Sequence, residues 1–171
     1  MKMKRFIFDL DNTLIYTNLL NNRAYNYALS KLNLKPINGI IRLTKSIVFS
    51  HYRLTEEEKD KILYFKKEFY LRNLKYTRPN VELISILKEQ KREHCILWTS
   101  ADEWRVLLLL KYYGINNSFK EIIYSEKINI EEELKKISCI FECGLKELII
   151  CEDNENIVNE ILRLKINVMN F

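Results

Sequence analysis

Short apolar runs recur along this chain and alternate with amphipathic stretches. Five runs have the length of a buried β-strand; they cover residues 5–10, 94–98, 121–125, 147–151 and 166–171. Apolar positions at helical spacing predict helices between and before the later runs, at about 80–91, 102–113, 130–142 and 154–164. Strands that alternate with helices are typical of βαβ units. We therefore predict an α/β fold with a doubly wound, mostly parallel sheet.

Helix-end signals fit these boundaries. Ser100 with Glu103 resembles a capping box, and Asn129 with Glu132 resembles a similar start of the next predicted helix. Gly114 and Gly144 stand where helices are expected to end, which favours left-handed conformations at both glycines.

Residues 15–78 show no strand-like alternation. Helical patterns lie near residues 19–33, 40–49 and 55–74, the second being the weakest. We expect an α/β core formed by residues 1–14 and 79–171, with a small all-helical cap inserted after the first strand. The alternative is a helical layer that belongs to a single domain.

Composition narrows the class of protein. With 171 residues and 47% apolar residues, the chain can bury a substantial core. No apolar run approaches the ~20 residues that a membrane span requires, and the basic start is followed by too short an apolar stretch for a signal peptide. We expect a soluble, cytoplasmic protein.

The net charge of +5 mildly favours an anionic partner, although we favour a solvated, lysine-rich surface as its explanation. The charges are interspersed and form no basic run of five, which argues against nucleic acid. Only three glycines are present, so neither a dinucleotide-binding G-x-G-x-x-G nor a phosphate-binding G-x-x-x-x-G-K-[ST] loop can be built. Four cysteines with two histidines give no zinc-site spacing, and we expect reduced, structural thiols.

Polar residues follow four of the predicted strands. They are Asp9, Asp11, Asn12 and Thr13, then Thr99 and Ser100, then Ser125, Glu126 and Lys127, and finally Glu152, Asp153 and Asn154. Ligands of open α/β sheets bind beyond the carboxyl ends of the strands, so these side chains are expected to share one crevice.

This set of side chains indicates phosphoryl transfer assisted by a bound hard cation. Clustered carboxylates need a cation to neutralise them, and oxygen ligands without His or Cys favour Mg²⁺. A lysine and a hydroxyl can hold a phosphoryl group. One carboxylate can act as a nucleophile, and a second, two residues away, can transfer protons.

Three segments resemble motifs of the haloacid dehalogenase (HAD) superfamily of phosphatases. "FDLDNTL" is similar to its first motif, D-x-D-x-T after an apolar strand, "CILWTSA" to its second and "ELIICEDNENI" to its fourth. "RPNVELISILKEQ" resembles the segment by which members with a helical cap return to the core. The matches occur in family order over nearly the whole chain. The resemblance implies a HAD-like, Rossmannoid fold, and we expect the sheet order 3-2-1-4-5, with the strands numbered along the chain.

The resemblance also implies roles for the acidic residues. Asp9 would be the nucleophile and a Mg²⁺ ligand. Asp11 would be the general acid/base, with its backbone carbonyl as a second ligand. Asp153 would be the third ligand, Glu152 would contact a water of the metal, and Thr13 would hold the turn of the first motif.

Phosphate binding is implied for the second and third motifs. Thr99 and Ser100 can bind the phosphoryl group or cap the following helix, and we favour Thr99 for phosphate. The usual third-motif lysine, followed shortly by proline, has no clear counterpart. Lys127 is our choice, whereas Lys135 and Lys136 lie in a helical pattern that faces solvent.

We therefore predict a Mg²⁺-dependent phosphatase that hydrolyses a small phosphomonoester, such as a nucleotide or sugar phosphate, through an aspartyl-phosphate. Its partner would be a small phosphorylated metabolite, with no membrane, and the protein would be a monomer or homodimer. A phosphomutase or phosphotransferase would use the same residues. A third possibility is a non-catalytic switch module that binds phosphate or metal.

Overall fold

The chain folds into two compact units. The computed structural model describes residues 4–169. One unit is formed by the chain up to Ile15 and again from Pro79, and the other by Tyr16–Arg78. The candidate motifs all lie in the first unit.

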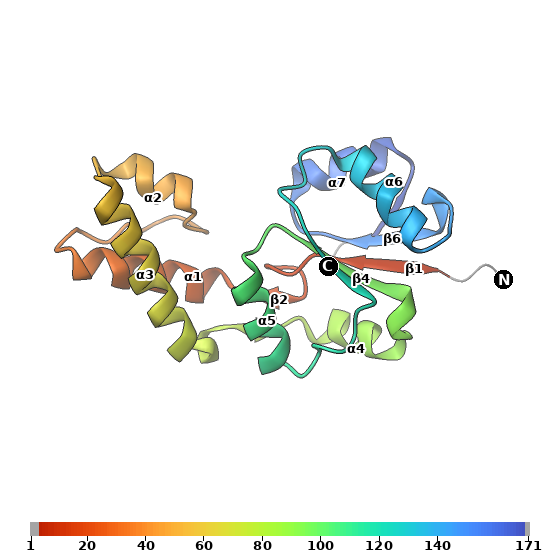
Figure 1. The fold of residues 1–171 in the computed structure, drawn as a ribbon, viewed down its shortest axis with the longest axis horizontal. Helices are drawn as coiled ribbons and strands as arrows, with labels where there is room; N and C mark the ends of the chain where they lie inside the picture. Colours follow the sequence, from red (N-terminus) through yellow and green to blue (C-terminus); the bar gives the residue numbers. More distant parts are fainter. Residues whose placement is uncertain (1–3, 170–171) are drawn as a thin grey trace. The chain divides into compact units, whose positions relative to one another are not determined.

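A parallel, five-stranded sheet is the centre of the first unit (Figure 1). Its strands are β1 (Arg5–Phe8), β4 (Cys95–Thr99), β5 (Glu121–Tyr124), β6 (Leu148–Cys151) and β7 (Asn167–Met169). Their spatial order is β5-β4-β1-β6-β7, which is 3-2-1-4-5 when these five strands are numbered along the chain. The predicted fold class is confirmed. Positions 170 and 171 of the last predicted strand lie outside the described residues.

Helices cover both faces of this sheet. They are α4 (Val81–Glu89), α5 (Glu103–Tyr112), α6 (Ile130–Ile140) and α7 (Glu155–Arg163), with short 3-10 turns at Arg92–His94 and Leu145–Glu147. Figure 1 shows α6 and α7 on one side of the sheet and α4 and α5 on the other. On the first side, Ile7, Ile96 and Ile150 of adjacent strands pack against Leu134 of α6 and Ile161 of α7. This buried layer fixes the strand ends that carry the polar residues.

Two of the predicted helix ends were wrong. Gly144 has a φ of −80° and is not left-handed; α6 ends at Ile140, earlier than expected, and Glu142 takes the left-handed conformation with a φ of 53°. Ser100 does not cap α5, because that helix begins at Glu103 and Asp102 holds the N-cap position without a side-chain bond. Asn129 is the N-cap of α6 as predicted, but its side chain makes no capping hydrogen bond.

The second unit is helical. It contains α1 (Asn18–Lys31), α2 (Lys45–His51), α3 (Glu56–Arg72) and a 3-10 turn at Leu74–Tyr76. Two short strands, β2 (Ile15–Tyr16) and β3 (Arg78–Pro79), pair with each other where the chain passes from one unit into the other and back. Helix α1 packs along α3. Asn22 and Asn26 of α1 bind backbone groups of the following loop, including the N–H of Leu43 at 2.7 Å and that of Ile37 at 3.0 Å. These bonds fix the loop in a non-helical conformation, and the helix that we predicted over 40–49 begins only at Lys45.

Within residues 4–169, no helix combines the length and the apolar composition that crossing a bilayer requires. All four cysteines are free.

Candidate active site

The turn after β1 presents the two aspartates of the first motif. The Asp9 N–H donates to the carbonyl of Cys151 at 2.9 Å, which continues the pairing of β1 with β6 by one residue. Asn12 then adopts a left-handed conformation with a φ of 61°, and its N–H donates to the carbonyl of Ile15 at 2.7 Å. The strand therefore ends in a closed turn with Asp9 at its start. Both Asp9 and Asp11 are buried.

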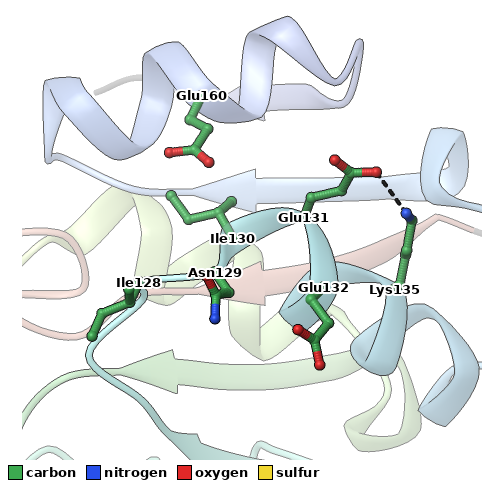
Figure 2. A pocket seen from close by; sticks show the side chains of 7 residues that line it. All are labelled: Ile128, Asn129, Ile130, Glu131, Glu132, Lys135 and Glu160. Carbon is green, nitrogen blue, oxygen red and sulfur yellow. Dashed lines mark hydrogen bonds and ion pairs between the residues drawn. The ribbon is translucent and has the colours of Figure 1, made fainter.

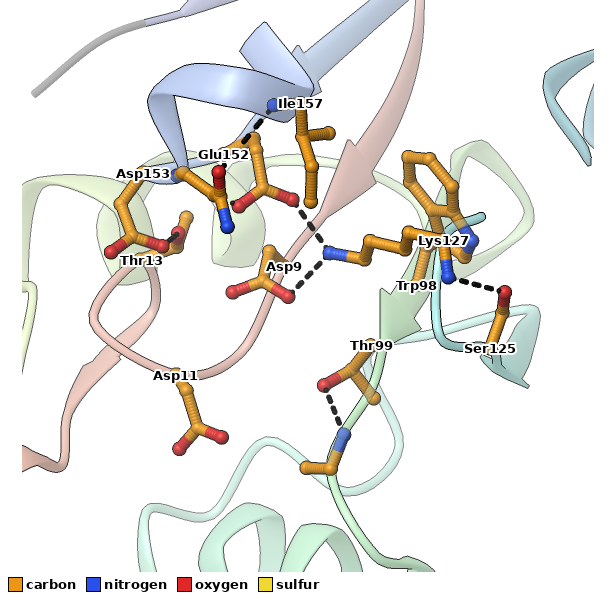
Figure 3. A network of polar contacts seen from close by, with 12 residues as sticks. Asp9, Asp11, Thr13, Trp98, Thr99, Ser125, Lys127, Glu152, Asp153 and Ile157 are labelled. Carbon is orange, nitrogen blue, oxygen red and sulfur yellow. Dashed lines mark hydrogen bonds and ion pairs between the residues drawn. The ribbon is translucent and has the colours of Figure 1, made fainter. Parts of the chain in front are cut away.

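Lys127 joins this turn to the end of β6. Its Nζ lies 2.6 Å from Oδ1 of Asp9 and 2.6 Å from Oε2 of Glu152, and only 3% of the lysine side chain is exposed. Lys127 itself is left-handed, with a φ of 54°, and its N–H donates to Oγ of Ser125 at 2.9 Å. Figure 3 shows the lysine side chain extended from the loop after β5 to the carboxylates of Asp9 and Glu152. The third-motif lysine chosen from the sequence thus lies directly beside the predicted nucleophile.

Burial and charge shift the ionisation of this pair. Burial, with a smaller contribution from the charge of Glu152, raises the pKa of Asp9 from 3.8 to about 7, because the two effects together outweigh the opposing effect of Lys127. Burial alone would lower the pKa of Lys127, but the two carboxylates overcome it and raise the pKa above the ordinary value. The carboxylates therefore favour the charged form of Lys127, whereas burial disfavours the charged form of Asp9.

Asp9, Glu152 and Asp153 can converge on one cation. Each offers a carboxylate oxygen, and these oxygens lie within 4.8 Å of one another. Asp153 is exposed and its Oδ1 accepts a hydrogen bond from Oγ1 of Thr13 at 3.2 Å, whereas Glu152 is buried and its Oε1 accepts the N–H of Asn154 at 3.0 Å. An all-oxygen donor set with a solvent-facing member fits Mg²⁺, which usually keeps several waters. Asp9 and Asp153 could ligate it directly, and the cation would supply positive charge against which a phosphoryl oxygen can be bound.

Asp11 has a partner that sequence reasoning missed. Arg105 of α5 donates from Nη2 to Oδ2 of Asp11 at 2.6 Å and from Nη1 to Oδ1 at 3.2 Å, and both side chains are less than 9% exposed. Figure 3 shows the Asp11 side chain turned away from Asp9 and Lys127. The signal was present in the sequence, because Arg105 lies four residues before Leu109 on the apolar face of the helix.

The two hydroxyl residues of the second motif differ in their exposure to solvent. Thr99 is 1% exposed and its Oγ1 accepts the N–H of Ala101 at 3.2 Å, whereas Ser100 is exposed. Both line a cavity of about 450 Å³ beyond β4 and β5. The rest of its wall is formed by Ala101, Asp102, Glu103, Tyr124, Ser125 and Glu126.

The two rejected lysines point to solvent. Lys135 pairs with Glu131 at 2.6 Å and Lys136 with Glu132 at 2.8 Å, all on the exposed surface of α6. A cavity of about 410 Å³ lies beside the start of this helix, and its wall includes Ile128, Glu132 and Lys135 (Figure 2). None of the predicted site residues lines it.

Structural comparison finds relatives that span nearly the whole chain. A predicted phosphoglycolate phosphatase from Haemophilus somnus 129pt is 18% identical with a TM-score of 0.78, over 98% of this chain and 84% of that one. A HAD hydrolase of family IA, variant 3, from Entamoeba histolytica HM-1:IMSS is 17% identical with a TM-score of 0.72, over 99% and 84%. A HAD-superfamily hydrolase of subfamily IA, variant 1, from Geobacter sulfurreducens PCA is 12% identical with a TM-score of 0.73, over 97% and 85%. At these identities the likeness is one of fold.

Sequence comparison gives the family. No curated protein matches the sequence. The family model described as haloacid dehalogenase-like hydrolase matches residues 6–167, which include every candidate motif. The chain belongs to the haloacid dehalogenase-like hydrolase family.

Proposed function

We propose that this protein is a Mg²⁺-dependent phosphatase that hydrolyses a small phosphomonoester through an aspartyl-phosphate on Asp9. The observation that carries the proposal is the convergence of Asp9, Lys127 and Asp153 at the carboxyl edge of the parallel sheet. A nucleophilic carboxylate, a buried ammonium group and an oxygen-rich cation site are the parts that phosphoryl transfer to a carboxylate requires. The names of the structural relatives, two hydrolases and a predicted phosphoglycolate phosphatase, agree with it.

Asp9 carries out the first chemical step. Its carboxylate attacks phosphorus, the P–O bond to the leaving group breaks, and the leaving oxygen takes a proton from Asp11. Lys127 keeps one Asp9 oxygen fixed at 2.6 Å, which leaves the other oxygen to attack. The ammonium group and the Thr99 hydroxyl then bind the charge that develops on the transferring phosphoryl oxygens.

Asp11 also serves in the second step, in which water attacks the phosphorus of the aspartyl-phosphate and releases phosphate and Asp9. Asp11 accepts a proton from that water. Because Asp11 faces Arg105 in this conformation, both transfers need its side chain to turn from α5 toward the reacting oxygen.

We also propose that the helical unit, Tyr16–Arg78, acts as a cap that takes part in substrate choice, as the resemblance to capped relatives implies. A nucleotide or a sugar phosphate is the expected substrate class.

Phosphate release from a panel of phosphomonoesters, with Mg²⁺ or with a chelator, tests the proposal. The panel should include nucleoside monophosphates, sugar phosphates and phosphoglycolate, and Asp9→Asn is the matched variant. We expect Mg²⁺-dependent release by the natural protein and none by the variant. Turnover that survives Asp9→Asn, or that needs no divalent cation, would contradict the mechanism. Phosphate that appears only when a second hydroxyl compound is added would indicate a phosphotransferase instead.

A further inference from the structure

Trp98 lies next to the proposed site but was not among its predicted residues. It directly precedes Thr99, the final residue of β4, and is only 1% exposed. Its indole packs in the apolar layer between the sheet and α6, near Ile130 and Leu134. Such a residue would ordinarily be assigned to the core alone.

A specific hydrogen bond fixes the indole. Nε1 of Trp98 donates to Oε2 of Glu133, a residue of α6, at 2.8 Å. A buried indole N–H needs a partner of this kind, and the bond sets the angle at which the ring stands. The strand that ends in Thr99 and the helix that follows Lys127 are thereby tied together.

The face of this fixed ring meets the ammonium group of Lys127. The Nζ atom lies 4.8 Å from the centroid of the Trp98 ring, which is within the ~6 Å range of cation–π attraction. The same atom is 2.6 Å from both Asp9 and Glu152. Figure 3 shows the ring of Trp98 beside the lysine side chain as it reaches toward the carboxylates. A lysine side chain is flexible, and here three groups confine its charged end.

We propose that Trp98 is a positioning residue that holds the ammonium group of Lys127 against Asp9. The indole supplies an apolar wall and a π face behind the lysine, and Glu133 holds the wall in place. In this role Trp98 contacts Lys127 and takes no direct part in the reaction. Its effect on the reaction rests on the proposed function and passes through Lys127.

Steady-state kinetics of folded variants tests this role. Trp98→Leu removes the π face, whereas Trp98→Phe keeps a weaker one. We expect kcat to fall about tenfold in Trp98→Leu and about threefold in Trp98→Phe, in line with the strength of a desolvated cation–π contact. Ile96→Ala is the matched control, because Ile96 is a buried residue of the same strand and apolar layer. It should lower thermal stability while kcat per folded molecule stays unchanged. An unchanged kcat in Trp98→Leu overturns the proposal.

A double-mutant cycle separates positioning from packing. In the Lys127→Met background, Trp98→Leu should change kcat by less than about twofold, because the group it positions is gone. A further loss as large as in the natural protein would mean that Trp98 acts through general packing, and would overturn the proposal.

Fluorescence gives a readout that does not depend on turnover. The chain has two tryptophans, so in a Trp104→Phe background Trp98 is the only indole. Lys127→Met should then change the emission intensity or wavelength of Trp98 in the resting protein, since a charge leaves the ring face. An unchanged emission overturns the contact itself, whereas a lack of phosphatase activity in the natural protein overturns the proposed function.

Discussion

The ammonium group of Lys127 lies 2.6 Å from Oδ1 of Asp9, although 118 positions separate the two residues in the chain. The contact is buried, and the same nitrogen reaches Glu152 at 2.6 Å. One cation thus holds together two carboxylates that would otherwise repel each other in a desolvated site. The fold buries a second charged pair as well, Asp11 with Arg105.

Removing the ammonium group should destabilise the protein. Lys127→Met leaves two buried carboxylates without their partner, and we expect the free energy of unfolding to fall by about 3–5 kcal/mol. Chemical denaturation without divalent cations measures this. Lys135→Met is the matched control, because Lys135 pairs with Glu131 at the same 2.6 Å but with its side chain 59% exposed. Lys135→Met should change the free energy of unfolding by no more than about 0.5 kcal/mol. Equal losses in the two variants would show that burial does not determine how much the Lys127 pair stabilises the fold.

Arg105 should matter for stability as well. Arg105→Gln leaves the buried Asp11 carboxylate without its two-bond partner, and we expect a loss of about 3–5 kcal/mol in the free energy of unfolding. Arg72→Gln removes a pair with Glu68 in which the arginine is 76% exposed, and should cost about 0.5 kcal/mol or less. A small effect at Arg105 would mean that Asp11 readily finds other partners.

The raised pKa of Asp9 predicts a pH dependence of stability without metal. A carboxyl group whose pKa is raised on folding from 3.8 to about 7 stabilises the fold fully below the lower value, and this contribution is lost as the pH rises toward 7. Over that window the contribution of Asp9 should make the free energy of unfolding fall with pH by at most about 1.4 kcal/mol per unit, the limit for one proton. Asp9→Asn should lack this contribution, so matching slopes in the two proteins would refute it.

Mg²⁺ should stabilise the folded protein. The carboxylates of Asp9 and Asp153 converge only in the folded state, so a bound cation shifts the unfolding equilibrium by mass action. Thermal unfolding should therefore occur at higher temperature as Mg²⁺ is added, with a much smaller shift in Asp153→Asn. Asp102→Asn is a suitable control, since Asp102 is an exposed acid outside the carboxylate cluster. A shift of the same size in Asp153→Asn would place the cation elsewhere.

The sheet and the position of its polar edge could be predicted from the sequence. Apolar runs of strand length define the strands, and the rule that ligands bind beyond the carboxyl ends brings Asp9, Thr99, Lys127 and Asp153 to one edge. The sheet order followed from the family resemblance, and the structure confirms it.

The contacts between side chains could not be predicted. Whether Arg105 reaches Asp11, or Trp98 stands beneath Lys127, depends on the rotation of α5 and on rotamers that are set only when the layers pack. The helix-end signals in the sequence also failed where more than one residue could take the left-handed position after a helix. Glu142 rather than Gly144 took the left-handed position because α6 ended early.

Trapping the covalent intermediate tests the central claim most directly. The natural protein should be mixed with Mg²⁺ and a phosphomonoester that it hydrolyses, quenched in acid within one turnover, and digested for mass spectrometry. The account predicts the added mass of one phosphoryl group on Asp9, and its absence in Asp9→Asn or after chelation of Mg²⁺. A phosphoryl group on another residue, or turnover with an unmodified Asp9 throughout, would contradict it.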